Sequence, residues 1–144
     1  MKVLLKLLDN RSNRKLMFVF LAISFISLVI AFIIGISDNP PGIALTYIAV
    51  STLILVFVHR WREVKKFVIL LIASVIGFPI FVILHNLFYA LAVLSSDISV
   101  LYQLLEFLHA LFFIIAIILC PPGIVIGGIG SIVIHFKRKR SGRS

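Results

Sequence analysis

Long apolar stretches without charged side chains dominate this chain, and short polar segments separate them. A helix needs about 20 apolar residues to cross the roughly 30 Å hydrocarbon core of a bilayer. The pattern predicts transmembrane helices at about 16–37, 43–59, 67–94 and 110–136. We therefore expect an all-α integral membrane protein, a small bundle of four transmembrane helices, with five helices as the alternative.

Prolines mark where these helices begin, bend or end. Pro40 and Pro41 follow the first span and suit the first turn of the second, where a missing backbone N–H costs little. Pro79 lies inside the third span and predicts a kink there. Pro121 and Pro122 predict a helix break in the last apolar run, because each proline drives the preceding residue out of the helical region.

The segment near 98–111 has an amphipathic pattern. Leucines recur on one helical face, and the opposite face carries Ser99, Tyr102, Gln103, Glu106 and His109. We expect this segment to lie along the outer membrane interface. Residues 98–136 are long for one straight crossing and short for two. One net crossing is favoured, because two would place the basic C-terminal tail outside.

Positive charge is confined to the ends of the spans. All 14 Lys and Arg residues fall within 2–15, 60–66 and 137–143. Cytoplasmic loops of membrane proteins are rich in Lys and Arg, so both termini are predicted to be cytoplasmic. Residues 1–15 are expected to lie on the inner headgroup layer, and residues 137–144 form a basic tail. The expected partners at this face are anionic headgroups.

The composition excludes an ordinary soluble domain. With 62% hydrophobic and 13% charged residues, the chain lacks the polar surface that a soluble core needs, so we expect one membrane domain over residues 1–144. The net charge of +9 is explained by topology, and nucleic acid is not an expected partner.

Signatures of catalysis and metal binding are missing from the sequence. Cys120 is the single cysteine, which excludes an intrachain disulfide and the metal patterns that need cysteine pairs. Neither an HExxH nor a G-x-S-x-G motif occurs. We therefore expect no enzyme activity, no catalytic residues, no bound metal and no cofactor.

Two ladders of small residues indicate close helix packing. One ladder comprises Ser27, Ala31 and Gly35, and the other comprises Gly123, Gly127 and Ser131. Small residues at every fourth position allow two backbones to approach closely, and dispersion contacts then hold the helices together within lipid. Packing within the chain is favoured over packing against a second subunit or a different protein.

Histidines form two groups by predicted depth. His59 and His135 lie near the inner ends of spans, and His85 and His109 lie toward the outer side. Pairs at matched depth are what bis-histidine haem ligation requires, so a haem redox protein is one alternative. A second is a small oligomeric transporter or channel in which His85, Asn86, Glu106 and His109 form an outer ligand or proton site.

The interpretation we favour is an accessory, regulatory or assembly-type membrane component that acts through helix contacts. It rests mainly on the absence of catalytic, cofactor and transport signatures from the sequence, and the small-residue ladders indicate helix faces that could make such contacts. Its expected partners are the lipid bilayer and either another membrane protein or further copies of the chain. The very short loops favour the plasma membrane of a prokaryote.

Overall fold

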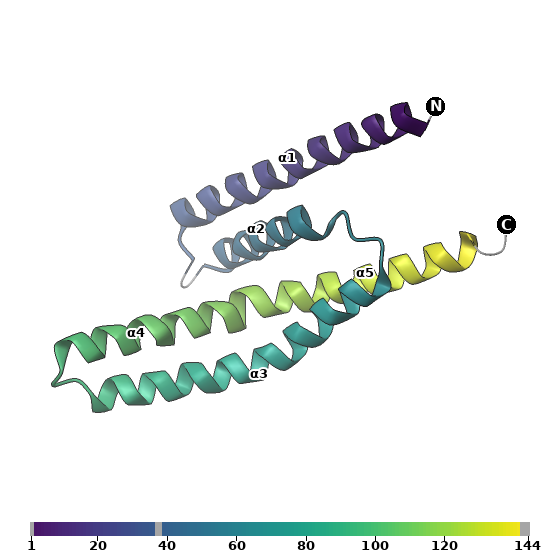
Figure 1. Cartoon of the computed structure of the whole chain (residues 1–144). Coiled ribbons are helices and arrows are strands. Elements are labelled where there is room, and N and C mark those ends of the chain that lie inside the picture. The colour runs from purple at the N-terminus through teal and green to yellow at the C-terminus, as the bar shows by residue number, and fades with distance from the viewer. Residues whose placement is uncertain (1, 37–38, 142–144) are drawn as a thin grey trace. The chain divides into compact units, whose positions relative to one another are not determined.

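All regular secondary structure is helical in the part of the chain that the structure describes (Figure 1). The structure is a computed structural model that describes the backbone of residues 2–36 and 39–141 and the side chains of 13–36 and 39–140. Four helical segments are long and apolar enough to cross a membrane: Asn13–Ile34, Pro40–Val58, Val64–Leu94 and Ser99–Arg140. The chain is therefore a multi-pass membrane protein.

Two compact units divide the chain, residues 1–62 and residues 63–144. We call them the first and the second hairpin, because each consists of antiparallel helical segments joined by a short turn. We predicted a single membrane domain, which requires the two hairpins to associate with each other, and this stays a prediction.

The first hairpin contains α1 (Lys2–Ile34) and α2 (Pro40–Val58). Helix α1 ends at Ile34, earlier than predicted, because Gly35 adopts a φ of 88° that glycine tolerates and other residues disfavour. The Asn39 side-chain amide donates a hydrogen bond to the carbonyl of Ile34 at 2.8 Å. Pro40 and Pro41, predicted to open the second span, are the first two residues of α2.

A seam of small residues closes the first hairpin. Its buried members are Ser24, Ser27 and Ala31 of α1 and Gly42, Thr46 and Ala49 of α2. The Ser24 hydroxyl donates a 2.8 Å hydrogen bond across the seam to the carbonyl of Ala49. At the turn, Gly42 packs directly on the Gly35 carbonyl and leaves no space for a Cβ atom. The predicted ladder therefore ends at Ala31, while Gly35 serves the turn.

The second hairpin contains α3 (Val64–Leu94), α4 (Ser99–Phe113), the π-helical segment η1 (Ile114–Leu119) and α5 (Cys120–Ser141). The last three follow one another without a break and run antiparallel to α3 (Figure 1). The segment near 98–111 is helical, but it does not form a separate element along the interface. It is the start of this long helix and packs on α3, with Leu105 buried.

The predicted helix break at Pro121 and Pro122 is wrong. Both prolines lie in the first turn of α5, and the helix passes through them. The π-helical segment directly before them explains the continuity: the Cys120 N–H bonds to the carbonyl of Ile115, five residues back. This wider turn shifts the hydrogen-bond register just where two N–H groups are missing. Pro79 lies inside α3, which also continues through it.

Glycines set the contact between α5 and α3. A Cβ atom at Gly123 would collide with the Ser74 hydroxyl, and one at Gly130 would collide with the Phe67 ring. Between them, a Cβ atom at Gly127 would lie 2.7 Å from the backbone nitrogen of Leu71. The predicted ladder residue Ser131 is only half-buried and donates its hydroxyl hydrogen to Gly128 of its own helix. The observed seam is thus Gly123, Gly127 and Gly130, and it is used inside the chain.

Both arms of the second hairpin exceed the thickness of a bilayer. The 31 residues of α3 and the 42 residues of Ser99–Arg140 correspond to about 46 Å and 63 Å of helix at 1.5 Å per residue. A hydrocarbon core is about 30 Å thick, so the ends of this hairpin must tilt or project beyond it.

Candidate functional site

Two histidines meet across the second hairpin. The rings of His85 in α3 and His109 in α4 stack with centroids 4.1 Å apart and an interplanar angle of 24°. The His85 Nδ1 lies 3.1 Å from the His109 carbonyl oxygen, and the His109 Nδ1 lies 3.3 Å from the His85 carbonyl oxygen. Each residue therefore donates a hydrogen bond to the backbone of the other.

Aromatic rings extend this pair on both sides. Tyr89 lies one turn after His85 and contacts the His109 ring, with centroids 5.2 Å apart. Phe113 lies one turn after His109 and contacts the His85 ring at 5.1 Å. The sequence analysis missed both aromatic residues, although each stands four positions after a histidine, the spacing that places side chains on one helix face.

The paired histidines form one wall of an open hollow in the hairpin surface. Its volume is about 480 Å³, and it is lined by His85, His109, Ala110, Phe113 and Ile114. Ala110 contributes only a methyl group to this lining, although most of its neighbours in the sequence are larger apolar residues. The hollow therefore combines two imidazole rings with an otherwise apolar lining.

The other two residues of the predicted outer site stand apart from this pair. The Asn86 side chain is exposed, and its amide donates a 2.8 Å hydrogen bond to the Val82 carbonyl of its own helix. Glu106 is half-buried one turn before His109 and is not part of the hollow's lining. Within the described residues, no group of three or more His, Cys, Asp or Glu side chains could hold a metal ion. The structure thus assembles two of the four predicted site residues.

The outer histidine pair does not fit haem ligation. Two axial histidines hold the iron between their rings, with one ring on each side of the porphyrin. The rings of His85 and His109 instead stack directly on each other at 4.1 Å, which leaves no space for an iron between them.

The inner histidines belong to different hairpins. His59 follows α2, directs its Nδ1 hydrogen toward the carbonyls of Val56 and Leu55 at 2.8 and 3.1 Å, and meets the edge of the Phe20 ring. Its Nε2 atom is buried and has no hydrogen-bond partner. His135 is exposed near the end of α5 beside Phe136. Neither hairpin by itself brings these two histidines together.

Comparison with known proteins identifies no relative of this chain. No protein-family model, no curated protein and no solved structure matches the chain.

Proposed function

We propose that this multi-pass protein is an accessory or assembly-type component of a membrane complex, and that it docks on a transmembrane helix of a partner protein through one face of α1. In this proposal the chain is not an enzyme. Its termini lie in the cytoplasm, where the basic span ends contact anionic headgroups of a prokaryotic plasma membrane.

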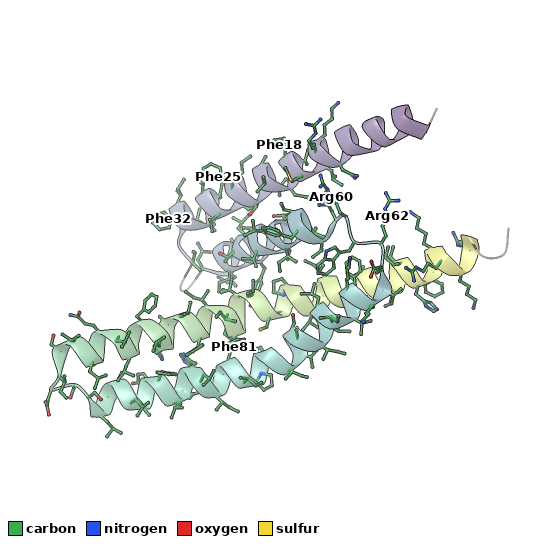
Figure 2. All side chains as sticks on the ribbon, viewed as in Figure 1. Phe18, Phe25, Phe32, Arg60, Arg62 and Phe81 are labelled. Atoms are coloured by element: carbon green, nitrogen blue, oxygen red, sulfur yellow. The ribbon has the colours of Figure 1, made fainter. Side chains whose placement is uncertain are left out.

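A stripe of phenylalanines on α1 carries the proposal. Phe18, Phe25 and Phe32 are spaced seven residues apart and expose 63%, 69% and 81% of their surface. Figure 2 shows the three rings along the side of α1 that faces away from α2. Side chains at this spacing stay on one face of a helix and can insert between the side chains of a facing helix. We call this set the phenylalanine stripe.

The small-residue seams support the same assignment. Ser24, Ser27 and Ala31 already contact α2, so the usual close-packing face of α1 is occupied within the first hairpin. A further helix therefore has to use a face of large side chains. Because lipid tails are as apolar as leucine, association of helices in a membrane depends on shape and contact area. A phenylalanine offers about 150–250 Å² of surface, which makes a row of three a substantial contact.

The test is a pull-down of the tagged full-length protein in gentle detergent, followed by mass spectrometry of proteins retained at near-stoichiometric amounts. The test variant carries Phe18→Leu, Phe25→Leu and Phe32→Leu, which keep the span apolar but remove the rings. A matched control carries Ile69→Leu, Ile76→Leu and Ile83→Leu on α3. These isoleucines have the same spacing and expose 55%, 54% and 66% of their surface.

We expect the native chain and the isoleucine control to retain one membrane protein, and the phenylalanine variant to lose it. Recovery of the native chain alone, or only with further copies of itself, would contradict the proposal of a different protein as partner. Equal retention by all three chains would contradict the role of the phenylalanine stripe.

A further inference from the structure

The His85 and His109 pair has a chemistry that goes beyond helix docking, and its hydrogen bonds define that chemistry. A backbone carbonyl can only accept a hydrogen bond, so both Nδ1 atoms must carry hydrogen to form the contacts at 3.1 and 3.3 Å. In a neutral imidazole, the other nitrogen then has a free lone pair. In the neutral pair both Nε2 atoms are therefore hydrogen-bond acceptors, and a ligand that pairs with them must bring an O–H or N–H donor.

The lining of the hollow specifies the rest of the ligand. Beside the histidines it offers Ala110, Phe113 and Ile114, which favour an aromatic or aliphatic group. Its volume of about 480 Å³ falls within the range of small-molecule sites, roughly 300–1,000 Å³. The fitting ligand has a small polar head that donates hydrogen bonds and a body that is apolar.

The depth of the site points to a molecule dissolved in the membrane. Lys65 and Lys66 mark one boundary of the span that α3 forms. From Phe67 to His85 the helix rises about 27 Å, close to the full thickness of a hydrocarbon core of roughly 30 Å. The histidine pair consequently lies near the opposite boundary, where the polar heads of amphiphiles meet their tails.

We propose that this hollow binds the phenolic or hydroquinone head of a lipid-soluble molecule. The hydroxyl donates to an Nε2 atom of the pair, the ring lies against Phe113, and the tail continues into the lipid. A phenolic hydroxyl is the stronger donor among the hydroxyl groups of amphiphiles, and an aromatic ring can stack on Phe113 and on the imidazoles. The corresponding quinone has only acceptor oxygens, so the neutral histidines bind it less tightly. This inference is independent of the phenylalanine stripe and of any protein partner.

A pair of probes that differ in one hydrogen-bond donor tests the site. The full-length protein, labelled with nitrogen isotope in histidine, is placed in lipid nanodiscs and titrated with para-nonylphenol or with its methyl ether, para-nonylanisole. The nitrogen resonances of His85 and His109 report occupancy directly. We expect para-nonylphenol to shift an Nε2 resonance and to bind about tenfold more tightly than the ether, the ratio that one hydrogen bond of about 1.4 kcal/mol produces.

Three variants separate the site from partition of the probes into lipid. His109→Phe keeps a ring at the stack and removes one of the two acceptors, so its affinity for para-nonylphenol should fall toward that for the ether, with the remaining preference carried by His85 Nε2. Ala110→Leu fills the hollow and keeps both histidines, whose resonances verify that the pair remains, and it should abolish the shift. Asn86→Ala alters an exposed side chain outside the hollow and should bind normally. Equal affinity for the two probes, or an unchanged shift in Ala110→Leu, would overturn the proposal.

Discussion

Gly127 is where the structure makes its sharpest quantitative prediction. A Cβ atom added there would lie 2.7 Å from the backbone nitrogen and 2.9 Å from the Cα of Leu71, whereas ordinary contact begins at 3.4 Å. The obstacle is backbone, which cannot rotate away, so Gly127→Ala forces α5 away from α3 by about 0.7 Å at this point. A gap of 0.5–1 Å forfeits roughly a quarter to a half of each dispersion contact along the seam.

We expect Gly127→Ala to lower the free energy of unfolding by about 1–3 kcal/mol, the usual cost of overpacking a tight contact. The measurement is unfolding of the purified protein in mixed micelles as the fraction of denaturing detergent rises. Gly128→Ala is the matched control, because a Cβ atom at Gly128 meets no atom within 4 Å. It should leave stability unchanged or raise it by up to about 1 kcal/mol through helix propensity.

The same experiment decides what the glycine ladder is for. Equal stability of the two alanine variants would refute the seam between α3 and α5. A Gly127→Ala variant that unfolds normally, but in the pull-down loses a protein that the native chain retains, would place the glycine face between subunits. The sequence favoured packing within the chain over packing between subunits, and the contact with Leu71 supports the same arrangement.

Three further predictions concern the first hairpin, the histidine pair and the topology. Ser24→Ala removes the 2.8 Å hydrogen bond to the Ala49 carbonyl and should lower the free energy of unfolding by about 0.6–1.7 kcal/mol in the same assay. Ser131→Ala loses only a hydrogen bond within its own helix and should lower it less. Equal losses would contradict the cross-helix role of Ser24. Nitrogen NMR should find hydrogen on the Nδ1 atoms of His85 and His109, and hydrogen on their Nε2 atoms instead would show that the reciprocal carbonyl bonds do not form. A membrane-impermeant maleimide should label Ser96→Cys in intact cells and Glu63→Cys only in opened cells, and the reverse pattern would invert the predicted orientation.

The spans and turns could be predicted well from the sequence because their signals are local. An apolar run predicts a span, and Pro40 and Pro41 suit the first turn of α2, where the structure places them. Pro121 and Pro122 were misleading because their effect depends on the register of the preceding turn. The π-helical segment Ile114–Leu119 absorbs the missing N–H groups, and its purely apolar sequence gives no sign of this.

The histidine pair could be predicted only in part. From their positions in the spans, His85 and His109 were predicted to lie on the same side of the membrane. The amphipathic pattern, however, predicted that the His109 side chain faces water. In a soluble protein the apolar face is the buried one, whereas in lipid a leucine face is equally stable outside the bundle. The structure accordingly leaves Leu104 54% exposed and turns His109 toward α3.

The seam of the second hairpin shows the same limit. A strict four-residue ladder led from Gly127 to Ser131, whereas the structure uses Gly130. Neighbouring residues on one face of a helix are three or four positions apart, and the packing partner determines which spacing is used. Phe67, whose ring covers Gly130, lies more than sixty positions earlier in the chain and carries no local mark of this contact.

Photocrosslinking in intact membranes tests the proposed docking face most directly. A benzoylphenylalanine replaces Phe25 in one chain and Ile76, exposed to 54% on α3, in another. We predict that position 25 yields one protein adduct of defined mass and position 76 yields lipid adducts. Lipid adducts at both positions would contradict the assignment of the phenylalanine stripe as a contact for a partner helix.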